Sequence, residues 1–262
     1  MKTLYKYLFI FLCSTLFVAC SEEKIEPFSS ERGINFLAPN GYGDFIDNYN
    51  QLSTDINFYT YYVTEGLEIK ELPLQLGVQL EGEISTTPIN IRLKAIEKED
   101  YELADIIIPA DSAIEAGKYQ RGITITCQKP QVFDKEYGAV ITFDYENSDV
   151  VPGTKERQNY QITVKDATIW EDMEVSNENE WNESYSSTLG VYGPIKVRFI
   201  LATLGKLEYS YNAIKNLYYY TTSYPNYGFK KVMDQLKTAL EEYNNTHDEP
   251  LCEPDGTLVT FN

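Results

Sequence analysis

Residues Ile89–Ile96 read INIRLKAI, and this stretch sets the fold class that we predict for the chain. Apolar side chains occupy every second position from Ile89 to Ala95, and polar side chains fill the positions between them. Successive side chains of a β-strand point to opposite faces, so this period places one set in a core and the other in solvent. The stretch is therefore predicted to be a half-buried strand.

Similar runs lie on both sides of this strand and are separated by turn residues such as Gly82, Pro109 and Gly138. The predicted strands are Ile34–Leu37, Ile56–Val63, Leu72–Leu80, Ile89–Ile96, Ile106–Ile108, Ile123–Cys127, Ala139–Tyr145 and Tyr160–Val164. Many short strands with frequent turns favour an antiparallel sandwich of the immunoglobulin-like type. We assign this β-sandwich domain to residues 32–168.

The composition changes after the last predicted strand, where an acidic segment contains Trp170 and Trp181. We interpret it as a connection that the two tryptophans pin to the folded parts. Phe229–Tyr243 has one apolar and one charged face at helical spacing. Tyr192–Leu204 fits a helix by its apolar spacings of three and four, and its alternating apolar residues also fit a strand. The predicted fold class is α+β, with a small, mainly helical C-terminal subdomain over residues 169–262.

The amino-terminal residues have the form of a bacterial lipoprotein signal. Two lysines precede the apolar run Tyr7–Val18, which is shorter than the ~20 apolar residues of a membrane span. Phe17–Cys20 resembles a lipobox, so residues 1–19 are predicted to be a signal peptide and Cys20 to be the lipidated residue. The alternative is an ordinary signal peptide in which Cys20 stays unmodified.

The residues after Cys20 bear on where the protein is displayed. Ser21–Lys24 is similar to the acidic tag that sends lipoproteins of Bacteroides-type bacteria to the outer face of the outer membrane. We therefore expect a lipid-anchored outer-membrane protein that faces the cell exterior, with residues 20–31 as a polar tether.

The charge of the chain argues against nucleic acid as a partner. Its 262 residues carry a formal net charge of −18, and removal of the signal peptide with its two lysines lowers this to −20. Such a surface repels a phosphate backbone, so no nucleic-acid partner is expected.

Two cysteines, Cys127 and Cys252, remain beyond Cys20, and they form either one disulfide or two free thiols.

The segment Asp100–Thr126, DYELADIIIPADSAIEAGKYQRGITIT, resembles the repeat of Calx-beta sandwich domains. The resemblance implies an immunoglobulin-like sandwich, and some of those domains bind calcium through acidic loop ends. The corresponding acids here are Asp100, Asp105, Asp144, Glu146 and Asp149. No spacing among them enforces a calcium loop, so we interpret them as solvated turn residues and expect no metal and no cofactor.

Asp111–Ala113 resembles a three-residue O-glycosylation acceptor, which would place a glycan on Ser112.

Over nearly its whole length the chain resembles a family of lipoproteins from Bacteroides-type bacteria, the domain of unknown function 4843. The features that carry this resemblance are the lipobox and acidic tag, the aromatic run Ile56–Val63, the segment after Asp100, Trp170, the run Leu189–Leu201 and the closing Asp255–Phe261. Family members resemble accessory proteins encoded beside starch-utilisation-type outer-membrane transporters, which implies a role in nutrient uptake. The family has no assigned catalytic residues, so the resemblance implies none here.

The sequence offers no catalytic constellation. His247 is the sole histidine and lies in a polar stretch, so neither a histidine triad nor a multi-histidine metal site is expected. Neither a Gly-rich phosphate loop after a strand nor a G-x-S-x-G elbow occurs. Two carboxylates would suffice for glycoside cleavage, but 40 acidic residues leave no pair singled out. We predict that the protein is not an enzyme.

Tyrosine is abundant, with 22 in the chain, and it is concentrated at Phe58–Tyr62 and again in residues 209–227. A tyrosine ring suits stacking on a sugar or anchoring in an interface. The predicted ligand-binding residues are Tyr218, Tyr219, Tyr224 and Tyr227. The first hypothesis is a non-catalytic binding accessory that captures a glycan or peptide for an outer-membrane nutrient-uptake system. The alternative is a structural subunit that docks to a transporter or sister lipoprotein and binds no small ligand.

Overall fold

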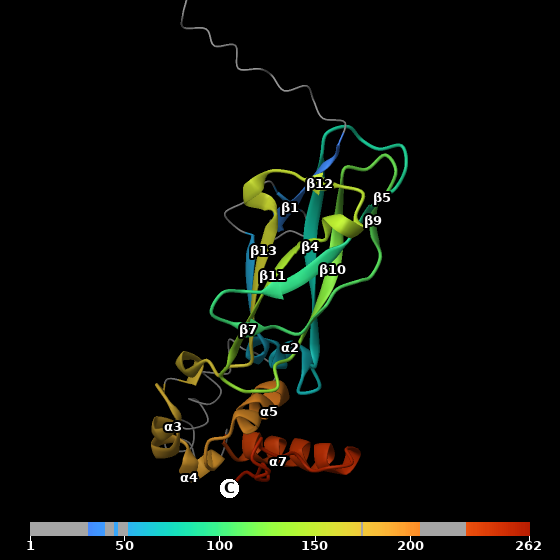
Figure 1. Cartoon of the computed structure of the whole chain (residues 1–262). Helices are drawn as coiled ribbons and strands as arrows, with labels where there is room; N and C mark the ends of the chain where they lie inside the picture. The colour runs from blue at the N-terminus through green and yellow to red at the C-terminus, as the bar shows by residue number, and fades with distance from the viewer. Residues whose placement is uncertain (1–30, 40–44, 47–51, 174, 205–228) are drawn as a thin grey trace, which may run out of the picture.

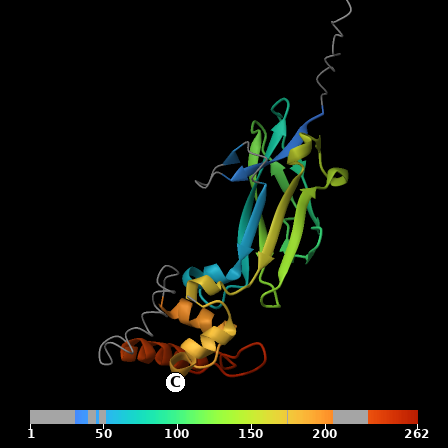
Figure 2. The ribbon, with the colours of Figure 1, turned by 90° about the vertical axis from the view of Figure 1, so that its left-hand side faces the viewer.

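The computed structural model describes residues 31–39, 45–46, 52–173, 175–204 and 229–262 (Figure 1). Strands make up most of the described residues between Gly33 and Lys165, and the later regular elements are helical. Figures 1 and 2 both show an elongated molecule, with the sheets stacked at one end and the helices gathered at the other. The first strand, β1 (Gly33–Pro39), begins at the end of the sheets that is far from the helices (Figure 1).

The larger sheet contains β1 (Gly33–Pro39), β2 (Phe45–Ile46), β4 (Glu71–Glu81), β8 (Ile106–Ile107), β10 (Gln120–Gln128) and β12 (Val151–Pro152). Its order is β12-β1-β4-β10-β8, with β2 beside β1. β12 runs parallel to β1, and every other pair in this sheet is antiparallel. The 11 residues of β4 span about 35 Å, which sets the length of the sandwich.

The smaller sheet contains β3 (Ser53–Asn57), β6 (Leu93–Glu97), β7 (Glu102–Leu103), β11 (Glu136–Phe143) and β13 (Asn159–Lys165). Its order is β3-β13-β11-β6, and both β3–β13 and β7–β11 are parallel pairs. A separate antiparallel pair joins β5 (Ile89–Ile91) to β9 (Ser112–Ile114). The prediction of an antiparallel sandwich is therefore correct only in part. The parallel pairs join segments that meet after long connections, which do not force the antiparallel direction that a hairpin does.

Aromatic side chains bridge the two sheets in the core. Phe36 of β1 stacks on Phe143 of β11, with ring centroids 4.3 Å apart, and meets Tyr160 of β13 edge-on at 6.1 Å. All three are buried. Such ring pairs add about 0.5–1.5 kcal/mol beyond the burial of their area, so they help to fix the spacing of the sheets.

The stretch Ile89–Ile96 alternates as predicted, with Ile89 and Ile91 buried and Ile96 exposed. It is not one strand, however, because β5 ends at Ile91 and pairs with β9, whereas β6 begins at Leu93 and pairs with β11. The backbone N–H of Arg92, between the two strands, donates to the Ser148 hydroxyl instead of to a strand. Alternation therefore predicted the burial but not the change of partner.

The prediction of a strand over Ile56–Val63 is wrong. β3 ends at Asn57, and the chain continues as η3 (Phe58–Tyr61) and α2 (Tyr62–Glu65). The Asn57 side chain accepts a hydrogen bond from the Tyr59 N–H, and a side-chain cap of this kind starts a helical turn. Phe58, Tyr59 and Tyr62 are fully buried, so these aromatics close the end of the sandwich.

The carboxy-terminal helices are α3 (Glu178–Ser184), α4 (Ser186–Leu189), α5 (Pro194–Leu204) and α7 (Phe229–Thr246), preceded by η6 (Trp170–Met173). The helix predicted from the apolar face of Phe229–Tyr243 is confirmed, and α5 decides for the helical alternative in Tyr192–Leu204. Phe199 of α5 meets Tyr243 of α7 edge-on at 6.4 Å, which packs the two helices together. None of the described helices combines the length and apolar character that a membrane crossing requires.

The two tryptophans of the acidic segment after β13 both pack against Tyr192, just before α5, in keeping with the predicted role of pinning this segment. The ring of Trp170 packs on Tyr192 at 4.8 Å, and the ring of Trp181 meets the same tyrosine at 6.0 Å. The Tyr192 hydroxyl lies 2.9 Å from the Thr168 hydroxyl, just beyond β13. Burial raises the pKa of Tyr192 to about 12, in keeping with a ring enclosed by its neighbours.

Candidate functional site

Several residues proposed from the sequence lie outside the described residues. They are Cys20, with the signal peptide and most of the tether, and the tyrosines Tyr218, Tyr219, Tyr224 and Tyr227. Their assignments remain predictions.

Ser112 lies in β9, where it pairs with Ile91 and is only 7% exposed. A glycan on its hydroxyl would have to displace the residues that cover this face of the strand. Burial of Ser112 in the folded chain argues against the glycosylation expected from the three-residue pattern, and the assignment remains a prediction.

Two of the acids suggested by the Calx-beta resemblance accept hydrogen bonds from neighbouring loops and turns. Asp149 accepts a hydrogen bond from the Asn90 backbone N–H at 3.0 Å, and Asp144 accepts one from the Asn147 amide at 2.7 Å. Among the described residues, no three acids, cysteines or histidines come together in a way that would hold a metal ion.

Cys127 and Cys252 are both free thiols in the structure. Cys127 is fully buried in β10, and burial raises its pKa to about 11. Cys252 lies in the carboxy-terminal segment, where its thiol donates to the Pro250 carbonyl at 3.2 Å. Of the two alternatives predicted, the structure shows the unpaired one.

His247 sits just beyond the end of α7, where its ring stacks on Tyr243 with centroids 3.7 Å apart. Its Nε2 lies 3.1 Å from the Glu68 carboxylate and its Nδ1 lies 2.8 Å from the Tyr243 carbonyl. These contacts tie α7 to the loop before β4.

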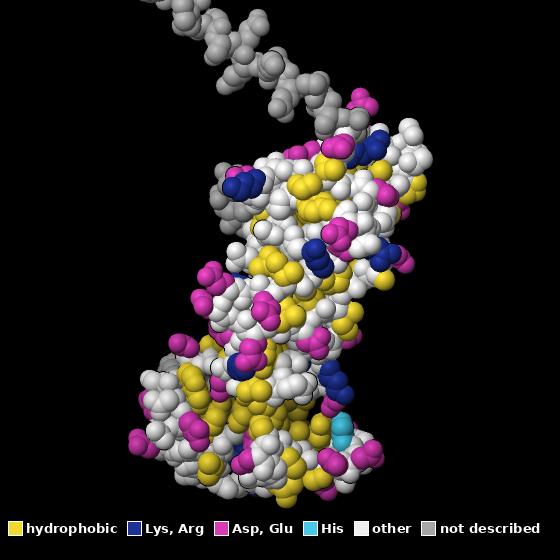
Figure 3. All heavy atoms as spheres, in the orientation of Figure 1, with side chains coloured by type: hydrophobic (Ala, Val, Ile, Leu, Met, Phe, Trp, Pro, Cys, Tyr) yellow, Lys and Arg dark blue, Asp and Glu magenta, His cyan; other side chains and the backbone are white. Residues whose placement is uncertain are grey.

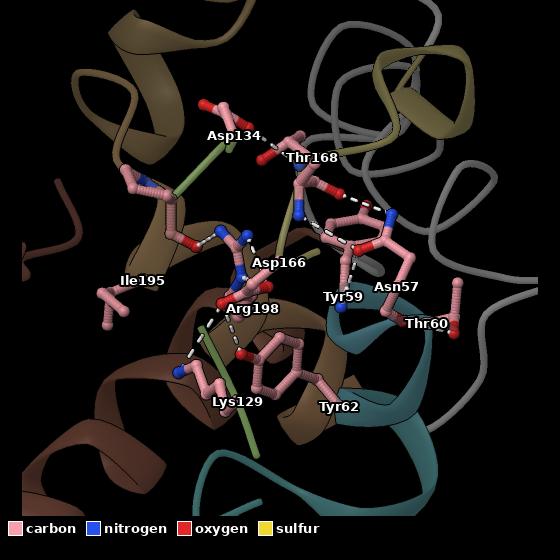
Figure 4. A network of polar contacts seen from close by, with 12 residues as sticks. Asn57, Tyr59, Thr60, Tyr62, Lys129, Asp134, Asp166, Thr168, Ile195 and Arg198 are labelled. Atoms are coloured by element: carbon pink, nitrogen blue, oxygen red, sulfur yellow. Dashed lines mark hydrogen bonds and ion pairs between the residues drawn. The ribbon is translucent and has the colours of Figure 1, made fainter. Parts of the chain in front are cut away.

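A buried polar network joins the helices to the sandwich (Figure 4). Asp166 directly follows β13, and its Oδ1 accepts hydrogen bonds from Arg198 Nε at 3.1 Å and from Arg198 Nη2 at 2.9 Å. Its Oδ2 accepts from the Tyr62 hydroxyl at 2.9 Å and lies 3.6 Å from Lys129 Nζ. Asp166 and Arg198 are fully buried, so the pair is shielded from water.

The network joins the ends of two strands to the start of α2 and to α5. Tyr62 begins α2, Lys129 follows β10, Asp166 follows β13, and Arg198 comes from α5. The Arg198 guanidinium also lies 4.6 Å from the centre of the Phe133 ring and donates from Nη1 to the Pro194 carbonyl at 2.7 Å. On the face seen in Figure 3, hydrophobic side chains gather where the sheets meet the helices.

Burial shifts the pKa values of two members of the network, Tyr62 and Lys129. It raises the pKa of Tyr62 far above its ordinary value, and the Asp166 charge raises it further. Burial lowers the pKa of Lys129, although the Asp166 carboxylate opposes the shift. Asp166 receives protein donors on both oxygens, so the arrangement holds two parts of the fold together.

A hollow of about 720 Å³ lies at the helical end of the molecule. The loop 190–193 between α4 and α5 lines it together with the carboxy-terminal segment 253–262 and Glu178 at the start of α3. This volume falls within the range of ordinary small-ligand sites. The side chains of Val191 and Leu258 line the hollow, and these residues are 65% and 55% exposed.

The walls of the hollow are fixed by hydrogen bonds. The Glu253 carboxylate accepts from the backbone N–H groups of Ile195 and Lys196, both at 2.9 Å, and so caps the start of α5. A negative group is favoured there by the unpaired N–H groups and the helix dipole. A Cβ at Gly193 would overlap this carboxylate, so the close approach requires glycine.

The loop on the other side is held just as closely. The Trp181 indole N–H donates to the Gly190 carbonyl at 3.2 Å, and Lys196 Nζ donates to the Val191 carbonyl at 2.7 Å. Gly190 has a φ of +82°, which favours glycine. The hollow is therefore pre-formed, and its exposed apolar side chains belong to segments whose backbone is held by hydrogen bonds.

A second hollow, of about 820 Å³, lies between α2 and the start of β4. Its lining includes Tyr61 and the glutamates Glu65, Glu68 and Glu71. Glu68 is already engaged by His247, and none of the strongly exposed apolar side chains lines this hollow. We take the hollow beside α5 as the better candidate for a binding site.

The comparisons with known proteins concern the fold. The crystal structure of an apo-form Calx CBD1 domain matches with a TM-score of 0.33 and 12% identity, over 52% of this chain and 97% of that chain. The crystal structure of Bacteroides thetaiotamicron EndoBT-3987 with Man5GlcNAc product matches with a TM-score of 0.34 and 12% identity, over 45% of this chain and 29% of that chain. No family model matches the chain, and no curated protein matches it.

At these TM-scores the likeness is weak and is limited to a sandwich-like fold. Calx-beta domains are among the structural neighbours, and the two-sheet arrangement itself rests on the strand pairing described above. The resemblance to a lipoprotein family is not supported by any matching family model.

Proposed function

We propose that the protein is a cell-surface lipoprotein, anchored through Cys20, that acts as a non-catalytic binding accessory of an outer-membrane nutrient-uptake system. It would capture a glycan or peptide in the hollow beside α5. The observation that carries this proposal is the position of that pre-formed hollow. One of its walls is held by the hydrogen bond from the Trp181 indole N–H to the Gly190 carbonyl. The hollow lies at the helical end, and β1 begins at the opposite end of the sandwich.

This arrangement suits an anchored capture protein. The predicted lipid attachment at Cys20 precedes β1, so the sandwich would stand between the membrane and the hollow. With β4 alone spanning about 35 Å, the hollow would be held well clear of the lipid headgroups. The tyrosines Tyr218, Tyr219, Tyr224 and Tyr227 stay a sequence-based proposal for additional contacts.

Removing the apolar contacts of the hollow is expected to abolish most of the binding. We would test the full chain, solubilised in a non-ionic polyoxyethylene detergent, against host and plant polysaccharides by affinity electrophoresis and against immobilised peptides. For any ligand found, the double variant Val191→Ser and Leu258→Ser should weaken binding at least about tenfold, because it removes two exposed apolar anchors.

The matched control is Ile84→Ser with Ile107→Ser, since both isoleucines are 55% exposed and lie on the sandwich. This control should leave the affinity unchanged. Equal loss in both double variants would point to general surface stickiness and not to the hollow. If no polysaccharide or peptide is retained, a structural subunit that docks to a transporter or sister lipoprotein becomes the better account.

A further inference from the structure

We infer that the hollow beside α5 takes a short peptide segment that combines a cationic side chain with an apolar one, and that it does not take an anionic or stacked-sugar ligand. This inference rests on the proposed function and names the class of ligand. Three properties of the lining carry it: its charge, its exposed apolar side chains and the state of its one tyrosine.

The charge of the lining is negative. Glu178 and Asp255 are exposed at the hollow. Asp255 accepts a hydrogen bond from the Thr257 backbone N–H at 2.8 Å, and this bond lowers its pKa, so the carboxylate stays charged even in mildly acidic solution.

The one basic side chain of the described lining, Lys196, already has a hydrogen-bond partner within the protein. Lys196 is the one lysine or arginine among the described residues that line the hollow, and its side chain is buried. Its Nζ donates a hydrogen bond to the Val191 carbonyl. Burial lowers the pKa of Lys196, and the charge of the Glu253 carboxylate partly opposes this shift. An anionic ligand would therefore meet Glu178 and Asp255 with no free cation, whereas a cationic side chain would meet complementary charge.

The apolar side chains give the ligand its second feature. Val191 and Leu258 line the hollow from two different segments, one from the loop before α5 and the other from the carboxy-terminal segment. Leu258 forms a single bridge with Cys252, which holds its backbone while its side chain remains exposed. An aliphatic side chain of a peptide would be covered by both residues, at roughly 0.8 kcal/mol for each buried methylene.

The tyrosine of the lining does not offer a platform for a sugar ring. Tyr192 is packed by Trp170 and Trp181, and its hydroxyl is bonded to Thr168. Sugar recognition by stacking needs a freely exposed aromatic face, whereas Tyr192 is only partly exposed and its ring contacts both tryptophans. The lining thus favours a peptide over a glycan among the two ligand classes of the proposed function.

The test uses three hexapeptides with blocked ends, GKVVKG, GEVVEG and GSVVSG, and the neutral sugar maltohexaose. Binding to the full chain in non-ionic polyoxyethylene micelles would be followed by tryptophan fluorescence, since the chain's two tryptophans pack behind the hollow and Trp181 bonds to its wall. We expect a saturable response to GKVVKG and at least about tenfold weaker responses to the other three probes.

Charge removal within the hollow provides the second part of the test. The isosteric double variant Glu178→Gln and Asp255→Asn should weaken GKVVKG binding about tenfold and make it less sensitive to salt. The control Glu83→Gln with Glu97→Gln removes the same charge from the exposed surface of the sandwich and should change the affinity less than twofold.

Four results would overturn the inference. One is an equal loss of affinity in the hollow and control variants, which would mean attraction to the overall negative charge. Another is equal binding of GEVVEG or GSVVSG. A third is saturable binding of maltohexaose that is lost on Leu258→Ser, which would retain the proposed function but replace the ligand class. A response to none of the four probes also rejects the inference, and the polysaccharide panel then decides the proposed function separately.

Discussion

Replacing Asp166 with alanine is expected to lower the free energy of unfolding by about 3–5 kcal/mol. The change leaves the Arg198 guanidinium fully buried without its carboxylate, and it removes the acceptor of the Tyr62 hydroxyl. A buried charge without a partner loses hydration that nothing replaces. Urea denaturation followed by circular dichroism measures the change.

The matched control is Asp111→Ala. Asp111 pairs with Arg92 at 2.9 Å, the same distance as the pair of Asp166 with Arg198, but its side chain is 87% exposed. Breaking this surface pair should cost less than about 1 kcal/mol. The double change Asp166→Leu with Arg198→Met should recover part of the stability lost in Asp166→Ala, because no unpaired charge remains. Equal costs for Asp166→Ala and Asp111→Ala would show that the buried network does not hold the two parts of the fold together.

Replacing Trp181 with alanine is expected to lower the free energy of unfolding by about 3–5 kcal/mol and to disturb the hollow. The indole is fully buried between Tyr185 and Tyr192, and its N–H bonds to the Gly190 carbonyl in the wall. Its loss leaves a cavity and removes a bond that fixes the loop before α5. Denaturation of the variant measures the first effect, and ligand retention measures the second.

Trp181→Phe keeps one aromatic ring in the buried site but removes the indole N–H and part of the ring volume. We expect it to cost about 1–2 kcal/mol less than the alanine variant. Trp170→Ala serves as the comparison on the other side of Tyr192, where the tryptophan is only partly buried, and it should cost less than Trp181→Ala. A smaller effect of Trp181→Ala than of Trp170→Ala would contradict the role given to the buried indole.

The spacing of apolar residues along the sequence predicted the strands and helices that have one buried and one exposed face. The alternation in Ile89–Ile96 predicted which side chains are buried, and the apolar face of Phe229–Tyr243 predicted α7. The same reasoning failed for Ile56–Val63, where an aromatic-rich run looks like a strand. There the Asn57 cap and the fit of Phe58, Tyr59 and Tyr62 against the end of the sandwich favour helical turns instead.

The buried network was not predictable from the sequence. Tyr62, Lys129, Asp166 and Arg198 are spread over more than half of the chain, and no spacing marks them as partners. Asp166 is one acid in a segment that is acidic throughout, so nothing local separates it from its exposed neighbours. A local hint is that the mostly apolar run Pro194–Leu204 contains the charged residues Lys196 and Arg198, since a charge buried in a helix needs a partner.

The hollow also depends on contacts between distant segments. Leu189–Leu201 and Asp255–Phe261 both stand out in the sequence, and each contributes one wall. Glu253 brings them together by capping α5, and Gly193 allows the close approach. A glycine just before the first turn of a helix is a visible signal, but the carboxylate that it accommodates lies 60 positions later in the chain.

The most direct test of a binding role for the hollow is hydrogen–deuterium exchange of the full chain, with and without a ligand that it retains. The account predicts slower exchange on binding in residues 190–196 and 253–262, which form the two walls, and unchanged exchange in the sandwich strands. Slower exchange confined to the sandwich, with no change in either wall, would contradict the account.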